Sequence, residues 1–209
     1  MLDIPWLEHG FGSRHSGEWN RQSGIVSLKQ VHSDICIHLT GGEGRVGEGD
    51  ALLTNVSGLR LAVRTADCIP ILLVDTRARA VAAVHAGWRG TARSISAKAV
   101  AAMREHFGSS PEEMLAAVGP GIGPCCYEVG PEVAIQFRDT FPERNDLNGR
   151  AHLDLPEANR RQLLTAGLPA GSICLARLCT CCSCEEFHSW RRDRERSGRM
   201  ISLVSVRPA

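Results

Sequence analysis

The sequence predicts an α/β fold: a single domain over residues 1–209 with a mixed β-sheet. The chain has 209 residues, of which 43% are hydrophobic and 22% charged, which suits one large domain with a full core. Apolar runs typical of strands interleave with segments of helical periodicity, as in α/β proteins. Several neighbouring strands are joined by links too short for a parallel crossover, so antiparallel pairs must accompany parallel ones.

The first half of the chain is predicted to consist mainly of strands. Residues 41–50 are rich in glycine and are expected to form a loop, followed by short strands over 51–56 and 59–63. Residues 69–74 and 80–84 are continuous apolar runs, as expected for strands buried on both faces. Helices must therefore pack on this sheet.

The first of these helices is expected to begin near Thr91, as N-cap, and to end near Phe107. Its core face is marked by four residues that recur every four positions: Ile95, Ala99, Met103 and Phe107. Farther along, the pattern predicts a shaped Gly-Pro loop and two helices that open on proline. These later elements are a strand over 113–118, the loop over 119–126, helices over 131–141 and 156–166, and strands over 173–178 and 200–206.

The composition argues against several classes of protein. A formal net charge of +1 is too small for a general nucleic-acid binder, and no apolar stretch approaches the ~20 residues of a membrane span. The nine cysteines form an odd set, and the amino-terminal residues lack the basic start and apolar run of a secretory signal. We therefore expect no nucleic-acid or membrane partner, and a reducing, cytoplasmic location.

Three segments carry reactive side chains at strand ends or turns. The strands over 69–74 and 80–84 should fold back on each other through a turn near residue 77, which would bring Cys68 beside His85. A zinc ion held by Cys68, His85 and His32 would keep one open position and could activate water. Without a metal, Cys68 could be a thiolate nucleophile activated by His85. Spacing alone does not choose between these sites and an ordinary buried cysteine.

The turn after His85 has the features of an anion site. Gly87 and Gly90 permit a tight turn, Arg89 offers a guanidinium, and the predicted helix start offers backbone N–H groups. The alternative, which the sequence supports equally well, is an ordinary strand-to-helix connection with a surface arginine. The arginine-rich run 191–196 is interleaved with acids, which is typical of a solvated face.

The densest cysteine cluster contains Cys179, Cys181, Cys182 and Cys184. It includes two interleaved C-x-x-C patterns, but four ligands within six residues would strain one tetrahedral site, and a strand would alternate their faces. We expect this cluster to pack without a metal, and the pair at 125–126 to be small buried residues.

Six motifs occur in a fixed order along the chain. They are Gln30-Val31-His32, Gly49-Asp50-Ala51-Leu52-Leu53-Thr54, Ala66-Asp67-Cys68-Ile69-Pro70, Val84-His85-Ala86-Gly87-Trp88-Arg89-Gly90, Gly119-Pro120-Gly121-Ile122-Gly123-Pro124-Cys125-Cys126-Tyr127, and Ser189-Trp190-Arg191-Arg192 with Gly198-Arg199-Met200. Together they resemble the family of multicopper polyphenol oxidase or laccase-domain proteins, now regarded as purine nucleoside phosphorylases and including the bacterial peptidoglycan editing factor. The resemblance extends from Gly10 to the last strand.

The resemblance implies a four-layer α/β sandwich similar to that of cysteine hydrolases, with a catalytic zinc on His32, Cys68 and His85. It implies phosphorolysis of adenosine, inosine, guanosine and S-methyl-5'-thioadenosine, together with deamination of adenosine. Purine nucleosides and inorganic phosphate would be the partners. The substrate-binding residues would be Arg14, Gln30, Asp67, Arg89 and Arg191.

Two other activities, and a non-enzymatic role in which the zinc site is structural, remain open at this point. The editing-factor relationship favours a metal-free hydrolase that acts through Cys68 and His85 on an amide or peptidoglycan precursor. The older family name favours copper-dependent phenol oxidation, but blue-copper sites use an axial methionine, and no methionine lies near the three motifs. Because the stretch between Arg14 and Lys29 is short for the family, a partner subunit could complete the pocket wall, and we expect a homodimer.

Overall fold

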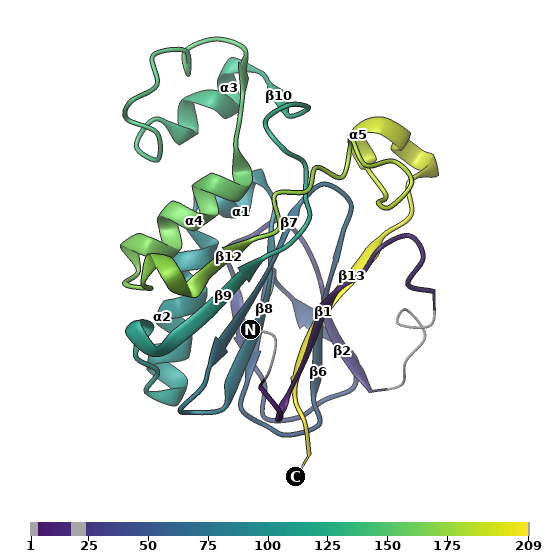
Figure 1. Ribbon diagram of the computed structural model, residues 1–209, viewed down its shortest axis with the longest axis vertical. Coiled ribbons are helices and arrows are strands. Elements are labelled where there is room, and N and C mark those ends of the chain that lie inside the picture. Colours follow the sequence, from purple (N-terminus) through teal and green to yellow (C-terminus); the bar gives the residue numbers. More distant parts are fainter. Residues whose placement is uncertain (1–3, 18–23, 209) are drawn as a thin grey trace.

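The computed structural model describes residues 4–17 and 24–208. Two sheets lie face to face, and helices cover the free face of the larger one (Figure 1). The larger sheet has six strands in the order β12-β9-β7-β8-β5-β3, and the smaller has five in the order β1-β13-β6-β2-β4. The described elements thus form one helical layer and two sheet layers.

The strand boundaries are as follows. The six-stranded sheet contains β3 (Cys36–His38), β5 (Ala51–Thr54), β7 (Ile69–Asp75), β8 (Ala80–Ala86), β9 (Met114–Val118) and β12 (Ile173–Leu175). The five-stranded sheet contains β1 (Leu7–Phe11), β2 (Ile25–Lys29), β4 (Gly44–Glu48), β6 (Arg60–Thr65) and β13 (Met200–Val206). A separate antiparallel pair is formed by β10 (Glu128–Val129) and β11 (Ala151–His152).

Both large sheets are mixed, which confirms the predicted α/β class with a mixed sheet. The described elements form three layers and not the four that the resemblance implies, because the helices pack on the free face of the larger sheet only. In the six-stranded sheet β3 runs parallel to β5 and β12 parallel to β9, whereas β7 is antiparallel to β8 and β9. In the five-stranded sheet β2 is parallel to β4 and β6, and β13 is antiparallel to β1 and β6.

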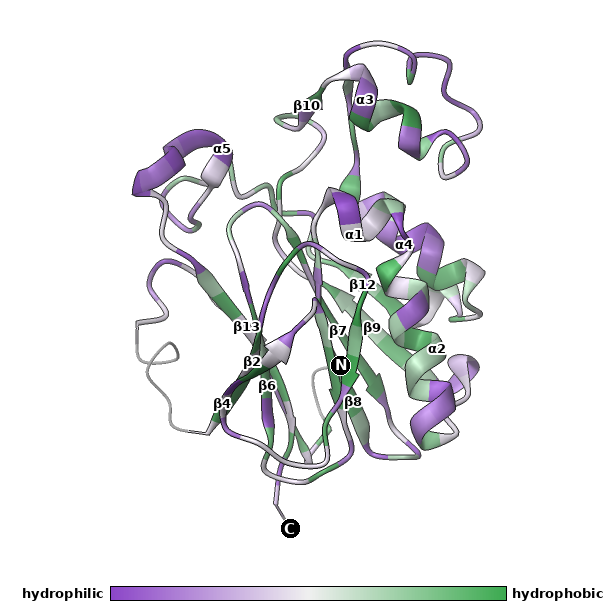
Figure 2. Ribbon diagram, turned by 180° about the vertical axis from the view of Figure 1, so that it is seen from behind, coloured by the Kyte–Doolittle hydropathy of each residue, from purple (hydrophilic) through white to green (hydrophobic). Residues whose placement is uncertain are grey.

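The core lies on both faces of β7 and β8. Successive side chains of a strand point to opposite faces, so Ile71 and Leu73 pack toward the helices while Leu72 and Val74 pack toward the second sheet. Figure 2 shows the resulting apolar strands between the more polar outer surfaces. This two-sided burial explains why β7 is apolar almost throughout.

The helical layer consists of α1 (Trp88–Ala92), α2 (Ile95–Phe107) and α4 (Leu155–Thr165). Two short helices, α3 (Pro131–Ala134) and α5 (Trp190–Asp193), lie at one end of the sheets (Figure 1). In the described ranges, no helix combines the length and the apolarity that crossing a membrane requires.

Several predicted boundaries are wrong. The helix expected over 91–107 is divided, because Ser94 adopts a left-handed conformation with φ of 62°. Its first part begins at Trp88 after Gly87, so Thr91 is a buried residue inside α1 and not an N-cap. The helix expected over 131–141 is α-helical only to Ala134 and continues as a 3-10 turn over Ile135–Phe137.

The strand β4 was not predicted from the sequence. The glycine-rich segment 41–50 contains β4, an exposed edge strand that pairs with β2. Most of β4 is solvent-exposed, so its sequence lacks the apolar alternation that marks a half-buried strand. The strand predicted over 173–178 ends at Leu175.

Candidate active site

Three side chains from distant parts of the chain meet at one end of the six-stranded sheet. The ligand atoms of His32, Cys68 and His85 all lie within 4.8 Å of one another, and Cys68 Sγ is 3.8 Å from His32 Nε2. Cys68 immediately precedes β7, and His85 lies in β8 opposite Pro70. The antiparallel hairpin therefore brings Cys68 and His85 together as predicted, and His32 approaches from the turn after β2.

The turn that carries His32 is held by Asp50. The Asp50 carboxylate accepts backbone hydrogen bonds from Val31 at 3.3 Å, His32 at 3.1 Å and Ser33 at 2.6 Å, and a fourth from the Ser33 hydroxyl at 2.6 Å. These bonds stabilise the left-handed conformation of His32, whose φ is 59°. Asp50 belongs to the Gly49–Thr54 motif, but the sequence alone predicted no role for it.

Asp50 also orients His85. The Nδ1 atom of His85 lies 2.7 Å from Asp50 Oδ1, and a carboxylate can only accept, so Nδ1 donates and Nε2 is left for a ligand. Burial raises the pKa of Asp50, but the bonds from His85 and Ser33 outweigh burial and lower it to about 2. A carboxylate behind a metal-binding histidine is a common second layer in metal sites.

Cys68 is poised as a thiolate. Burial raises the pKa of its thiol, but the nearby His85 and His32 outweigh burial and lower that pKa to about 6. The same pairing raises the pKa of His85 to about 9 against the opposing effect of burial. A thiolate and two imidazoles form a borderline-soft donor set of the kind that zinc prefers, so the residues fit this metal.

Gly87 permits the close approach of these groups. A Cβ atom at this position would lie 2.8 Å from His32 Cδ2 and 3.1 Å from Cys68 Sγ. The first distance is shorter than side chains tolerate. The site therefore requires glycine here for space, since Gly87 itself has an ordinary φ of −74°.

The three residues open into a cavity of about 670 Å³. Among the described residues, its lining contains a single acidic side chain, Asp67, and the aromatic rings of Trp88, Tyr127 and Trp190. The helices α1 and α5 that supply part of the wall lie at the same end of the molecule in both views (Figures 1 and 2). The cationic lining residues are Lys29, Arg45, Arg64, Arg89, Arg191, Arg194 and Arg199. Such an excess of cations attracts anions.

Four of the five predicted substrate-binding residues line this cavity. Arg89 stacks on Trp88, with its guanidinium carbon 4.6 Å from the ring centroid, and Arg191 lies over Tyr127 at 5.2 Å. Arg14 is the exception: its guanidinium Nη2 forms an ion pair with Asp193 Oδ2 at 3.5 Å, and it is absent from the described lining. Residues 18–23, within the short stretch that follows Arg14, lie outside the described residues.

Gln30 and Asp67 use their polar atoms on the protein itself. The Gln30 amide makes two 2.8 Å hydrogen bonds with the backbone of Arg64. The Asp67 carboxylate accepts from the Thr180 hydroxyl at 2.7 Å and from the Arg191 backbone at 2.6 Å. Both residues therefore shape the wall of the cavity, and cationic side chains are better placed to contact an anion.

The anion site predicted after His85 differs from the prediction in the groups that can contact an anion. Helix α1 begins at Trp88 and has only five residues, so Arg89 contributes its side chain and no long helix start lies beside it. Sequence reasoning missed Lys29, Arg45 and Arg64, which lie on β2, β4 and β6. They share no motif, and only the pairing of these strands brings them together.

Comparison with known proteins supports a common origin. The chain matches the family model described as multi-copper polyphenol oxidoreductase laccase over residues 14–207. A protein of Bacteroides thetaiotaomicron named purine nucleoside phosphorylase is 42% identical over 163 residues, which cover 75% of this chain and 60% of that protein. The adenosine deaminase RL5 of an unknown prokaryotic organism is 44% identical over 161 residues, covering 74% of this chain and 61% of that protein.

A solved structure agrees with the fold. The crystal structure of YlmD from Geobacillus stearothermophilus has a TM-score of 0.91 and 31% identity, and covers 100% of this chain and 94% of that one. The chain spans about three fifths of the length of the two curated relatives. The match over residues 14–207 takes in nearly the whole chain, which therefore belongs to the multi-copper polyphenol oxidoreductase laccase family.

Proposed function

We propose that this protein is a zinc-dependent purine nucleoside phosphorylase that also deaminates adenosine. The observation that carries the proposal is the convergence of His32, Cys68 and His85 at a cavity whose described lining has seven cationic residues and one acidic one. The substrates would be adenosine, inosine, guanosine and S-methyl-5'-thioadenosine, with inorganic phosphate. The names of the two curated relatives support both activities.

His32, Cys68 and His85 would hold the zinc ion. Zinc bound there would supply a Lewis acid and activate water at neutral pH. Asp50 keeps His85 in the tautomer that presents Nε2, and holds the His32 turn through its backbone bonds. These residues set the position of the reacting centre before substrate arrives.

The cationic lining would bind phosphate. In the described part of the chain, the guanidinium groups of Arg45, Arg64 and Arg194 have neither a hydrogen bond nor an ion pair, so each can meet an oxyanion. The rings of Trp88, Tyr127 and Trp190 offer surfaces on which a purine can stack. In phosphorolysis the bound phosphate oxygen forms a bond to the ribose anomeric carbon as the bond to the purine nitrogen breaks.

The test is to incubate zinc-loaded protein with adenosine and phosphate and to separate the products. Adenine with ribose 1-phosphate would report phosphorolysis, and inosine would report deamination. Omission of phosphate should abolish adenine formation and leave deamination. A zinc-loaded preparation that yields none of these products would refute the proposal.

One observation favours a second candidate, a cysteine hydrolase. The low pKa of Cys68 and the adjacent His85 form the kind of thiolate–imidazole pair that attacks an amide. Removal of metal with a chelator distinguishes the two. Phosphorolysis that is lost on chelation and restored by zinc supports the leading proposal. Amide cleavage that survives chelation but is lost on alkylation of Cys68 supports the hydrolase.

Copper-dependent phenol oxidation has weaker support. No methionine belongs to the described lining of the cavity, whereas a blue-copper site uses an axial sulfur ligand. We propose a cytoplasmic location, since the described cysteines are all free thiols. A homodimer remains a prediction, which sedimentation of the purified chain would check.

A further inference from the structure

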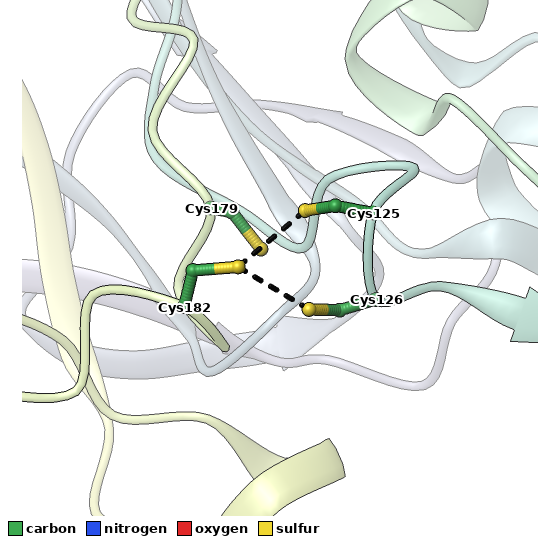
Figure 3. A group of neighbouring side chains, drawn as sticks. All are labelled: Cys125, Cys126, Cys179 and Cys182. Carbon is green, nitrogen blue, oxygen red and sulfur yellow. Dashed lines mark hydrogen bonds between the residues drawn. The ribbon is translucent and has the colours of Figure 1, made fainter.

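A second cluster of cysteines lies outside the active site. The sulfur atoms of Cys125, Cys126, Cys179 and Cys182 are all within 4.8 Å of one another. Figure 3 shows the four thiols pointing toward a common centre from two separate loops. The Sγ of Cys182 is 3.5 Å from that of Cys125 and 3.3 Å from that of Cys126. All four are free cysteines.

This arrangement corrects one expectation drawn from the sequence and agrees with another. Cys125 is exposed and Cys126 is half-buried, so the pair is not packed in a core. The dense run 179–184 does not supply four ligands, because only its Cys179 and Cys182 belong to the group of sulfur atoms that lie within 4.8 Å of one another. Two donors from each loop avoid the strain that four ligands within six residues would impose.

The geometry points to a metal site: we propose that these four cysteines bind a structural zinc ion as a tetrathiolate. A tetrahedral centre with Zn–S bonds of about 2.3 Å places its sulfur atoms roughly 3.8 Å apart. The observed separations of 3.3 and 3.5 Å, and the limit of 4.8 Å for the whole set, bracket this value. Small side-chain rotations are therefore sufficient to close the site.

The surroundings suit a bound thiolate. The backbone N–H of Gly123 donates to Cys179 Sγ at 3.2 Å, as N–H groups do around metal-bound sulfur. The two loops are already joined by backbone pairing, since Thr180 donates to the Gly121 carbonyl at 3.0 Å and Gly121 to that of Leu178 at 3.3 Å. The peptide scaffold therefore holds the two pairs of cysteines in register without a metal.

The site would stabilise one wall of the active cavity. Thr180, next to Cys179, hydrogen-bonds the Asp67 carboxylate, and Asp67 in turn accepts from the Arg191 backbone. Arg191 also donates to the carbonyl of Cys126 at 3.2 Å. A zinc ion that joins the two loops would fix the positions of Asp67 and Arg191, although it touches neither the cavity nor the first metal site.

Metal content of four purified proteins tests the proposal. We expect about two zinc ions per chain in the parent, about one in Cys182→Ser, about one in Cys68→Ala, and about two in the matched control Cys184→Ser. Cys184 belongs to the same run but lies outside the cluster. X-ray absorption of Cys68→Ala, which lacks the first site, should show four sulfur neighbours at about 2.3 Å.

Four results would overturn the proposal. One is a Cys68→Ala protein without zinc, and another is a Cys182→Ser protein with the metal content of the parent. The third is iron in place of zinc. The fourth is a disulfide in the cluster, which thiol titration of the unfolded chain would reveal as two missing thiols. Should Cys182→Ser fail to fold, Cys126→Ser replaces it. Since Cys182→Ser keeps His32, Cys68 and His85, failure here is separate from failure of the proposed phosphorylase.

Discussion

Asp50 connects the two histidines of the candidate active site. One carboxylate oxygen accepts from His85 Nδ1, and the two oxygens together accept the backbone bonds of the turn that carries His32. The residue is fully buried, so each of these bonds is shielded from water. The ligand geometry thus depends on a residue that does not itself contact the metal position.

Replacing this carboxylate by an amide should weaken metal binding. In Asp50→Asn an amide NH₂ would face either the His85 or the backbone donors, so at least one bond becomes a donor–donor contact. We expect zinc affinity to fall about 10- to 100-fold, as for other changes behind a metal-binding histidine. Competition with a chromophoric chelator measures this affinity.

Asp34→Asn is the matched control for this variant. Asp34 lies two residues after His32 but pairs with Lys98 and Arg93 on the surface. The zinc affinity of the Asp34→Asn protein should equal that of the parent. Equal affinities in all three proteins would show that Asp50 does not orient the ligands.

At the scale of elements, the connection from β8 to α1 decides how closely the ligands approach. We expect Gly87→Ala to lower zinc affinity at least about tenfold, because a Cβ 2.8 Å from His32 must displace the imidazole and ligand distances tolerate only about 0.2 Å. Gly149→Ala, where a Cβ meets open space, is the control. Calorimetric titration with zinc measures both, and unchanged binding by Gly87→Ala would contradict the requirement for glycine at this position.

The start of α4 provides a pH-dependent contribution to stability. Arg160 and Arg161 hydrogen-bond the Glu157 carboxylate, and chiefly the Arg160 bonds lower its pKa below 4.5. A carboxyl group whose pKa is lower in the folded state than in the unfolded state stabilises the protein at pH values above its unfolded-state pKa. This contribution disappears as the pH falls through the folded-state pKa. The helix should therefore lose this support in acid.

We expect Glu157→Gln to lower the free energy of unfolding by about 0.5–1 kcal/mol at pH 7, a small value because the pairs are partly exposed. The difference from the parent should shrink as pH falls below 4.5. Urea unfolding at several pH values measures it, with Glu105→Gln on the exposed face of α2 as control. A difference that is constant with pH would show that the ion pairs contribute nothing.

At the scale of the whole molecule, one sheet is shared by two cores. Leu73 packs toward the helices and Leu72 toward the second sheet, and both are fully buried in β7. Because neither core is complete without this strand, we expect the chain to unfold as one cooperative unit. Unfolding in one step is what the prediction of a single domain over residues 1–209 requires.

Truncation on either face tests this unity. Leu72→Ala and Leu73→Ala should each cost about 2–5 kcal/mol and shift one common transition. Leu178→Ala, at a side chain that is 48% exposed, should change stability by less than about 0.5 kcal/mol. Calorimetry that resolves two transitions, with each variant moving only one, would divide the molecule into two units.

The sequence by itself determined those features that depend on local pattern. The continuous apolar runs predicted β7 and β8, the turn between them predicted the meeting of Cys68 and His85, and β13 was predicted over its full length. These predictions succeed because strands buried on both faces need apolar residues throughout, and because a short connection forces antiparallel pairing.

Only the tertiary structure decided which distant segments meet. It placed β2, β4 and β6 side by side so that their cations share one cavity, directed Arg14 to Asp193, and brought Cys125 and Cys126 to Cys179 and Cys182. Strand order and loop contacts arise from packing between residues tens of positions apart. A local sequence pattern does not specify these distant partners. The burial of a whole sheet face selects them.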